Sequence, residues 1–571
     1  MPPWKRQMLP LSTVLVRQWE GESSPMFACA RFAIIFVMLL PGTLAMGATL
    51  PVLVEYCQST RASFARTVSR LYAINTLGAC LGALAGDFWL IRRLGLWQTS
   101  ALASAIDLLV GALGFWWLRR SIRPATATSS SAGEGLKASQ GLVIFLTGFC
   151  GIALEVLWIR SLVFFNGSDI YAFSTVVSTF LFGLVLGSFV ATRLGARVGV
   201  AGLLLGLALT IPISLLCTAH LREIRLMFQI QHFGIVRFLG AAVLILPATV
   251  LLGALFPLQT AWLVRQGAAR AVGQAYILNA GGSLMGSLLT GFVLLPALGL
   301  QNCFFLAAAV AVTAAVLVHP HSRLCQSALL VALTLPWLTP ADALSRKIYG
   351  RDLPNILYRE EDPYGDIALI RQWSAATWVH RNNLVVDGFN MMGNDAVARR
   401  YAGSLAALPM LLHPKPDRCL VICFGLANTL TVAVEMDRSQ QVDCIEITPA
   451  AVRAASHLDY VRRTLASPKL RVQFSDGRLY LATTERRYDV ITAEPPPPIH
   501  AGVVNLYTQE YFEHCKRSLN PGGIVSHWLP VDQMPGFEAR TIIRACQNVF
   551  PHTYLWMGCQ SHLFSWPAKN R

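Results

Sequence analysis

Apolar segments dominate the chain from residue 27 to residue 340, and they limit the folds open to it. We count roughly nine or ten segments long enough to span, or nearly span, a lipid bilayer. Backbone N–H and C=O groups inside a bilayer must bond to each other, so such segments form helices. The segments centre near residues 40, 80, 108, 151, 182, 207, 246, 284, 310 and 331, the last being short enough for the membrane interface. The sequence therefore predicts an α-helical transmembrane bundle.

Part of this apolar region is duplicated. Residues 41–51 (PGTLAMGATLP) match 247–257 (PATVLLGALFP), and residues 71–96 match 275–300. Five residues recur 204 positions later: Tyr72, Asn75, Gly78, Gly82 and Gly95 become Tyr276, Asn279, Gly282, Gly286 and Gly299. Both copies hold a Gly-xxx-Gly pair, whose spacing lets helix backbones approach closely. A further helix pair precedes the second copy only, so we interpret the repeat as incomplete and shortened at its N-terminal side, a plan typical of transporter-like bundles.

One acidic residue lies within an apolar segment. Glu155, in GIALEVLW, would be costly facing lipid, so we expect it to face the bundle interior or to pair, with Arg160 as candidate partner. It has either a functional or a packing role. Asn75, Asn279 and Asp87 are weaker candidates of the same kind.

Composition excludes several classes of protein. Hydrophobic residues make up 54% and charged residues 14%, which is too apolar for an ordinary soluble protein. Lys and Arg outnumber Asp and Glu by 22 to 9 in residues 1–340, but only by 25 to 22 in residues 341–571. The basic excess lies in short loops between apolar segments, as membrane flanks do, so nucleic acid is not an expected partner. The 13 cysteines are scattered without a CxxC pair, so neither a metal site nor a disulfide framework is expected.

A second region, from Arg418 to Pro498, has the pattern of a parallel sheet with crossover helices. Three short runs rich in β-branched residues, 419–423, 442–447 and 489–492, alternate with helical or polar segments. Ligands of such sheets bind at the carboxyl ends of the strands. We therefore predict an α/β domain with a ligand site at that edge.

Four features follow the predicted strands at this edge. Gly425 follows the first run, Glu446 lies near the end of the second, Asp476-Gly477 follows a further run, and Glu494 follows the last. A glycine turn before a helix exposes N–H groups, and an acid about twenty residues later can accept both ribose hydroxyls. Each feature alone is usually an ordinary turn or a solvated loop residue. Together, in this order, they favour a nucleoside site.

Residues 357–566 resemble the spermidine synthase family, the polyamine aminopropyltransferases, and in particular its membrane-fused branch. The resemblance is carried by LYREEDPYGDI (357–367), LVVDG (384–388), LPMLLHPKPDRCLVI (408–422), CIEITPAAV, SDGR, YDVITAEPPPP and AGVVNLYTQEYFEHCKRSLNPGGIVSHWLP (501–530). It implies a methyltransferase-like Rossmann sheet. The fold expected for the whole chain is thus an α-helical transmembrane bundle with an incomplete internal repeat, followed by an α/β Rossmann-like methyltransferase/spermidine synthase domain.

The resemblance also implies an activity: transfer of an aminopropyl group from decarboxylated S-adenosylmethionine to a diamine such as putrescine. An ammonium must lose a proton as it attacks, which requires a base. By resemblance, Glu494 is that catalytic base, and Tyr364 and Tyr507 line the amine pocket. Gly425, Glu446, Asp476 and Gly477 would bind the cofactor, with Glu446 on the ribose and Asp476 on the adenine.

Three positions depart from the family pattern. Leu426 stands where an acid would hold the amino group of the cofactor, Pro497 where a second acid of the catalytic loop would stand, and Gly365 where an amide would stand. Two alternatives to aminopropyl transfer therefore stay open. One is a catalytically degenerate nucleoside- or amine-binding domain that regulates a transporter-like bundle, and the other is an S-adenosylmethionine-dependent methyltransferase.

These expectations divide the chain into six parts and give it a location. We expect an integral, multi-pass cell-membrane protein whose soluble domain lies in the cytoplasm, where the cofactor is made. The parts are a tail (1–26), a first transmembrane half (27–120), a linker (121–140), a second transmembrane half (141–340), N-terminal strands of the synthase-like domain (341–416), and the Rossmann-like domain (417–571).

Overall fold

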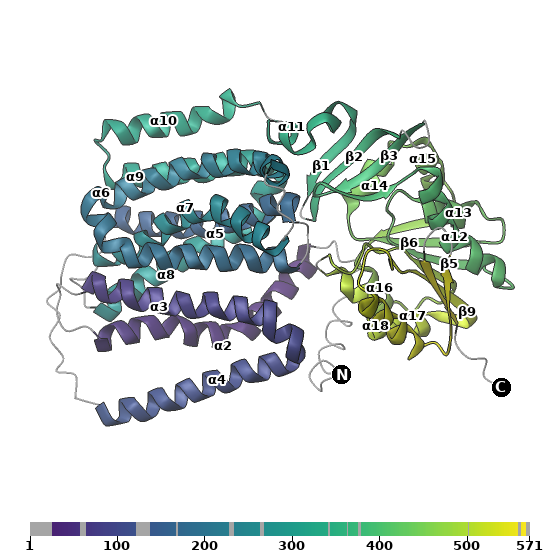
Figure 1. Cartoon of the computed structure of the whole chain (residues 1–571), viewed down its shortest axis with the longest axis horizontal. Helices are drawn as coiled ribbons and strands as arrows, with labels where there is room; N and C mark the ends of the chain where they lie inside the picture. Colours follow the sequence, from purple (N-terminus) through teal and green to yellow (C-terminus); the bar gives the residue numbers. More distant parts are fainter. Residues whose placement is uncertain are drawn as a thin grey trace. The chain divides into compact units, whose positions relative to one another are not determined.

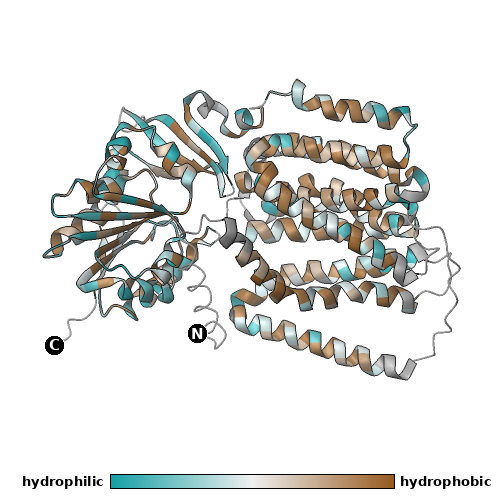
Figure 2. Ribbon diagram, turned by 180° about the vertical axis from the view of Figure 1, so that it is seen from behind, coloured by the Kyte–Doolittle hydropathy of each residue, from teal (hydrophilic) through white to brown (hydrophobic). Residues whose placement is uncertain are grey.

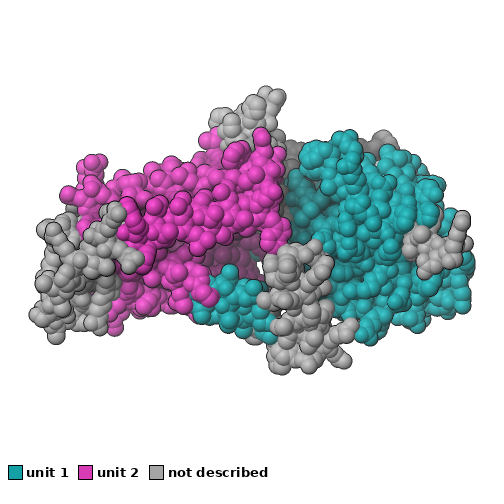
Figure 3. All heavy atoms as spheres, turned by 90° about the horizontal axis from the view of Figure 1, so that it is seen from below, with its two compact units in different colours: residues 1–40, 167–169, 349–571 teal, residues 41–166, 170–348 magenta. Residues whose placement is uncertain are grey.

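The computed structural model places most of the chain in two units, each described here by itself (Figure 3). One unit is helical and comprises residues 41–166 and 170–348; the other contains residues 349–571, together with 1–40 and 167–169. The structure describes residues 25–57, 64–121, 137–166, 170–227, 233–262, 268–340, 343–362, 364–374, 379–500, 502–557 and 561–566. The expected tail lies almost wholly outside these ranges, as does most of the expected linker.

The helical unit is built from long apolar helices (Figures 1 and 2). They are residues 41–57 of α2 (Pro25–Cys57), together with α3 (Phe64–Ala85), α4 (Ile91–Ser121), α5 (Ala138–Asn166), α6 (Ile170–Met227), α7 (Phe233–Thr260), α8 (Ala268–Leu289), α9 (Leu295–Val318) and α10 (Arg323–Leu338). A short helix, α11 (Ala343–Tyr349), follows. Within the described residues, seven helical stretches are long and apolar enough to cross a membrane. Two of these, Arg66–Trp116 and Val272–Val318, are each interrupted by a non-helical glycine.

The two copies of the repeated segment share the same backbone irregularities. A π-helical turn, η2 (Gly86–Leu90), precedes Gly95, and its counterpart η4 (Thr290–Leu294) precedes Gly299. Gly95 has φ 74° and ψ 169°, and Gly299 has φ 75° and ψ 166°. Positive φ is strained for residues with a Cβ, so glycine is required where these helices break. The two copies of the repeated sequence therefore have the same backbone conformation at these positions.

The two Gly-xxx-Gly pairs have different surroundings. A Cβ on Gly282 would lie 1.9 Å from the carbonyl oxygen of Phe145, and one on Gly286 would lie 2.5 Å from that of Phe149. Helices α5 and α8 therefore pack backbone to backbone. Gly78 and Gly82 have no such neighbour within 4 Å among the described residues. The glycine pair packs closely only in the copy that has α5 beside it.

Glu155 lies in α5 and is partly buried. The structure records no ion pair between Glu155 and Arg160, both of which it describes, so the expected pairing is wrong. Residues five apart on a helix point in different directions, which prevents the contact. Asp87, the weaker candidate, accepts a hydrogen bond from the hydroxyl of Ser174.

The second unit begins with a four-stranded antiparallel sheet in the order β1-β2-β3-β4. Its strands are β1 (Ile356–Asp362), β2 (Gly365–Ser374), β3 (Val379–Val386) and β4 (Phe389–Gly393). A short 3-10 turn, η5 (Gly350–Asn355), precedes them, and helix α12 (Ala396–Leu412) follows. Asp395 caps α12 by accepting from the N–H groups of Val397 and Ala398, both at 3.0 Å.

The main sheet has seven strands in the order β10-β11-β9-β8-β5-β6-β7. They are β5 (Arg418–Ile422), β6 (Gln441–Glu446), β7 (Leu470–Phe474), β8 (Tyr488–Ala493), β9 (Leu519–Trp528), β10 (His552–Met557) and β11 (Ser561–Trp566). Strands β5 to β9 are parallel, and β10 and β11 are antiparallel. The predicted α/β domain with a parallel sheet is confirmed.

Helices cover both faces of this sheet (Figure 1). Alternate residues of β5 enter different cores: Cys419 and Val421 face one, and Leu420 and Ile422 face the other. The first core is completed by α13 (Asn428–Glu435), α14 (Pro449–Ala455) and α15 (Asp459–Leu465). The second is completed by α16 (Gly477–Thr483), η6 (Val503–Tyr507), α17 (Gln509–Arg517) and α18 (Gly536–Gln547). Burial on both faces explains why β5, β6 and β8 carry apolar residues at consecutive positions.

Candidate active site

The loop between β5 and α13 has an unusual backbone. Cys423, Gly425 and Ala427 have φ values of 73°, 53° and 58°. A Cβ on Gly425 would lie 2.8 Å from Sδ of Met392, so this position combines positive φ with a close neighbour. The loop is therefore held in one shape beside β4.

Glu446, the last residue of β6, faces this loop and is buried. One carboxylate oxygen accepts the N–H of Phe424 at 2.7 Å, and the other accepts the N–H of Thr448 at 2.9 Å. Burial raises the pKa of Glu446, and these backbone donors oppose the rise. The backbone of Ile447 is a third donor to this carboxylate, which has about four acceptor positions, so one position remains for a ligand hydroxyl.

Asp476 and Gly477 form the start of α16. Oδ1 of Asp476 caps the helix, accepting the N–H groups of Arg478 at 2.8 Å and Leu479 at 3.0 Å. A Cβ on Gly477 would lie 2.5 Å from Cγ2 of Ile422, so glycine lets the helix approach the end of β5. The capping role accounts for Asp476 without a ligand.

Glu494 follows β8 and is buried. Its Oε2 accepts the hydroxyl of Thr429, in the first turn of α13, at 2.8 Å. Its Oε1 is buried without a hydrogen-bond partner among the described residues. Burial raises the pKa of Glu494 to about 7, although the hydroxyls of Thr429 and Tyr401 both act to lower it. A carboxylate with a pKa near neutrality can take up a proton at physiological pH.

The thiol of Cys423 shows that the predicted acids converge. Its pKa is raised first by burial and then by the charges of Glu446, Glu494 and Asp476. Three acids that lie far apart in sequence therefore surround one position at the carboxyl edge of the sheet.

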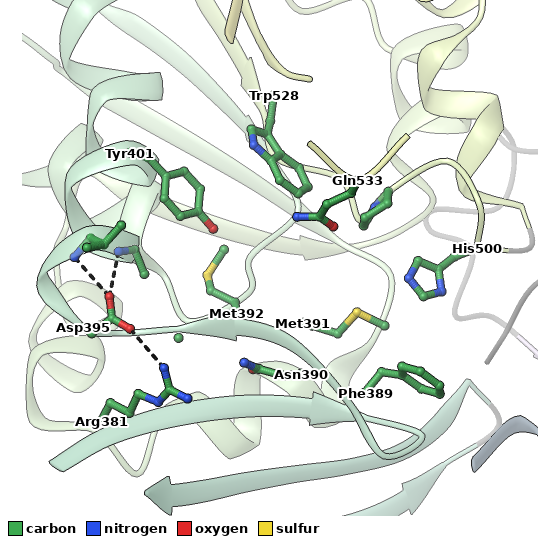
Figure 4. Close-up of a pocket in the computed structure, with 14 residues that line it drawn as sticks. Arg381, Phe389, Asn390, Met391, Met392, Asp395, Tyr401, His500, Trp528 and Gln533 are labelled. Carbon is green, nitrogen blue, oxygen red and sulfur yellow. Dashed lines mark hydrogen bonds and ion pairs between the residues drawn. The ribbon is translucent and has the colours of Figure 1, made fainter. Parts of the chain in front are cut away.

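A pocket of about 530 Å³ opens next to this edge (Figure 4). Tyr401 lines it and stacks on Trp528, with ring centroids 6.3 Å apart and planes 25° apart. Arg381 and Asp395 form an ion pair of 3.8 Å at one side. Burial raises the pKa of Tyr401, and the charges of Glu494, Asp395 and Asp532 raise it further. The lining residues are Arg381, Phe389, Asn390, Met391, Met392, Gly393, Asp395, Val397, Ala398, Tyr401, Pro497, His500, Trp528 and Gln533.

Neither predicted tyrosine lines this pocket, contrary to expectation. Tyr364 lies in the turn between β1 and β2 and is 55% exposed. Tyr507 is buried, and its hydroxyl donates to the carbonyl oxygens of Pro495 and Pro496, at 3.2 and 3.1 Å. It supports the loop after Glu494 from beneath. Tyr401 is the tyrosine of the pocket, and no short motif around it pointed to that role.

The three departures from the family pattern have structural counterparts. Leu426 is buried in the core, and its N–H points to Sδ of Met392 at 3.3 Å. Pro497 lines the pocket. A Cβ on Gly365 would lie 3.2 Å from both carboxylate oxygens of Asp387, so a larger residue would crowd that carboxylate.

Within the described residues no group of three His, Cys, Asp or Glu side chains could hold a metal ion. The eleven cysteines whose side chains the structure describes are free thiols, and most of them are buried.

Comparison with known proteins identifies the type of domain. Residues 398–558 match the family model of the spermine/spermidine synthase domain. The spermidine synthase of Dictyostelium discoideum is 25% identical over 210 residues, covering 36% of this chain and 70% of that protein. The polyamine aminopropyltransferase 1 of Streptomyces coelicolor is 26% identical over 407 residues, covering 67% and 74%. That match is longer than residues 349–571, so it extends into the helical unit.

Solved structures give weaker matches. The spermidine synthase of Thermotoga maritima has a TM-score of 0.32 at 22% identity, covering 37% of this chain and 72% of that one. Human methyltransferase-like protein 13, in complex with SAH, has a TM-score of 0.25 at 22% identity, covering 30% and 82%.

The C-terminal domain is thus spermidine synthase-like, and its homologues are aminopropyltransferases, which supports transferase activity.

Proposed function

We propose that this chain is a membrane-bound aminopropyltransferase in which Glu494 is the catalytic base. The proposal rests on three properties of the Glu494 side chain: its burial, its pKa of about 7 and the absence of a hydrogen-bond partner for Oε1 among the described residues. The hydroxyl of Tyr401 lowers the pKa of this carboxylate, and Tyr401 lines a pocket large enough for a small amine.

The residues at the sheet edge fit the nucleoside of decarboxylated S-adenosylmethionine. Glu446 keeps an acceptor position for a ribose hydroxyl, and Gly425 and Gly477 let the surrounding backbone approach closely. Asp476, beside them, would take the adenine amino group. When bound, this donor supplies an electrophilic carbon, and the sulfonium sulfur attached to it leaves as a neutral thioether that keeps the electron pair of the broken carbon–sulfur bond.

The protein has two tasks in such a transfer. Tyr401 and Trp528 place the amine, and the positioning of reacting groups accounts for much of the rate of a two-substrate reaction. As the amine nitrogen forms its new bond to carbon it loses a proton, and Oε1 of Glu494 accepts that proton. Putrescine is the first acceptor to test, because relatives carry the name spermidine synthase.

The helical unit supports membrane integration. Seven helical stretches among the described residues are long and apolar enough to cross a bilayer. Large apolar side chains such as Leu108 (75% exposed) and Trp89 (60% exposed) lie on their outer surfaces, where lipid would cover them. We place the synthase-like domain in the cytoplasm, where its donor is made.

One observation favours a second candidate, a binding domain without turnover. Leu426 is buried in the core, so no acid from this loop position reaches the pocket to hold the amino group of the donor. A lost contact to a charged group costs about 1.5–3 kcal/mol. In this case the domain would bind a nucleoside or amine and regulate the bundle.

The full chain in non-ionic detergent tests these alternatives. We would measure amine-dependent release of methylthioadenosine from decarboxylated S-adenosylmethionine for wild type, Glu494→Gln and the exposed control Glu513→Gln. Turnover that is lost only in Glu494→Gln supports the transferase. Donor binding without turnover supports the regulatory domain, and methyl transfer from intact S-adenosylmethionine would identify a methyltransferase.

A further inference from the structure

We propose that the amino edge of the seven-stranded sheet carries a second ligand site, which binds a phosphate-type dianion. A pocket of about 210 Å³ lies there, where β5, β6 and β8 begin. The candidate active site lies where the same strands end, so the two sites are separate, and this inference does not depend on the proposed function. The pocket is lined by Arg418, Gln441, Asp443, Arg486, Arg487 and Tyr488.

A buried carboxylate organises this pocket. Asp443 is 3% exposed, and its Oδ2 accepts Nη1 of Arg486 at 2.9 Å and the hydroxyl of Tyr488 at 2.8 Å. Its Oδ1 accepts Nε2 of Gln441 at 3.1 Å. The hydroxyl of Tyr488 lies 2.5 Å from that of Tyr480, which fixes it further. Both oxygens of the one acid that lines the pocket are therefore hydrogen-bonded, and this acid holds the Arg486 guanidinium at the rim.

Two more guanidinium groups meet at the same rim. Arg487 uses one nitrogen, Nη1, on the carbonyl oxygen of Leu519 at 3.2 Å. The side chain of Arg418 has no hydrogen bond or ion pair with any residue in the described part of the chain. Among the lining residues, three positive charges thus stand against one negative charge. A second carboxylate, that of Asp489, accepts the backbone N–H of Arg418 at 2.8 Å, so the rim keeps a net positive charge.

This net positive charge and the type of side chain define the ligand. An anion would offset the charge, and the planar fork of arginine matches phosphate oxygens with two parallel hydrogen bonds. A phosphate monoester carries close to two negative charges at neutral pH. The pocket is large enough for a phosphate group and part of the group attached to it. Both soluble phosphate esters and lipid headgroups have this chemistry.

The ordinary alternative is three solvated arginines that bind anions weakly and without preference. Phosphorus NMR line widths of inorganic phosphate, at constant ionic strength with the full chain in non-ionic detergent, distinguish the two. The test variant is Arg418→Gln/Arg487→Gln, which keeps the Arg486–Asp443 pair and hence the local fold. The control, Arg540→Gln/Arg544→Gln, removes the same charge from exposed positions of α18.

We expect wild type and control to broaden the phosphate signal equally, and the test variant to bind about tenfold or more weakly. Equal broadening by all three proteins, or none by wild type, would overturn the proposal. Competition then identifies the source. Dioctanoyl phosphatidic acid that displaces phosphate, where dioctanoyl phosphatidylcholine does not, indicates a lipid headgroup. Displacement by glucose phosphate as strong as by the lipid indicates a soluble ester.

Discussion

The hydroxyl of Thr429 donates a hydrogen bond of 2.8 Å to Oε2 of Glu494, although the two residues are 65 positions apart. Thr429 belongs to the first turn of α13, after β5, and Glu494 follows β8, the strand beside β5. This bond fixes one oxygen of the carboxylate and leaves the other, Oε1, without a hydrogen-bond partner among the described residues. The proposed base is therefore anchored on one side and available on the other.

The activity should depend on the ionisation of Glu494. Because its pKa is about 7, we expect kcat/KM to rise with pH and to level off above that value. Replacing Glu494 by Gln should lower kcat by about 10²–10⁴-fold and remove this dependence. A pH–rate profile from pH 5.5 to 9 checks both. A Glu494→Gln enzyme that keeps the wild-type profile would assign the base elsewhere.

Tyr401 should tune that ionisation. Its hydroxyl lowers the pKa of Glu494, so Tyr401→Phe should move the rise in kcat/KM to higher pH. It should also weaken amine binding, because the ring remains but its polar end is lost. The exposed Tyr364 provides the control, since Tyr364→Phe should leave the profile unchanged. A Tyr401→Phe enzyme with the wild-type profile would exclude this coupling.

Glu494 should also reduce the stability of the fold at neutral and alkaline pH. The folded pKa of about 7 lies above the ordinary value of 4.5, so the folded chain holds the proton more tightly. Its contribution to stability therefore falls as pH rises from 4.5 to 7 and is constant above. Glu494→Gln, compared with wild type, should therefore be more stabilising at pH 8 than at pH 5, by roughly 1–3 kcal/mol in the free energy of unfolding. Thermal denaturation of both proteins at the two pH values measures this difference.

His527 should make the domain sensitive to acid. It is buried among the rings of Tyr507, Tyr511 and Phe512, and burial lowers its pKa to about 3. The unfolded chain binds a proton near pH 6.5 and the folded chain does not, so stability is lost as pH falls through this window. The loss should reach about 2–4 kcal/mol at pH 4.

Replacing His527 by Phe should remove this loss. Neither ring nitrogen has a hydrogen-bond partner within the described ranges, so the substitution should cost little at pH 8. Melting temperatures of wild type, His527→Phe and the exposed control His552→Phe from pH 4 to 8 test it. An equal acid sensitivity of all three would show that other groups cause it.

The glycines of the repeat provide a matched pair for the helical unit. Gly282→Val places side-chain atoms against the carbonyl of Phe145 and should destabilise the packing of α5 on α8 by about 1–3 kcal/mol or more. Gly78→Val, at the equivalent position of the first copy, meets no neighbour in the described structure and should change little. Thermal unfolding in detergent compares them. Equal losses would mean that Gly78 also faces a packed surface.

The sequence by itself determined the parallel sheet and the edge at which acids collect. Short runs rich in β-branched residues that alternate with helical segments specify parallel strands, and parallel strands bring Glu446, Asp476 and Glu494 to one edge. The order of the strands in the sheet was seen only in the structure. The helix breaks at Gly95 and Gly299 follow from the duplicated sequence, because only glycine adopts that backbone easily.

Only the tertiary structure decided which side chains meet. Tyr401 and Trp528 come from α12 and β9, and their stacking depends on how the helix packs on the sheet. Tyr507, predicted to line the amine pocket, donates its hydroxyl to the carbonyl oxygens of Pro495 and Pro496 in the loop after Glu494. The ionisation of Glu494 depends on burial, which arises from packing by residues distant in the chain. Local sequence specifies strand β8 and the acid that follows it, whereas the pKa of that acid is set by the residues packed around it.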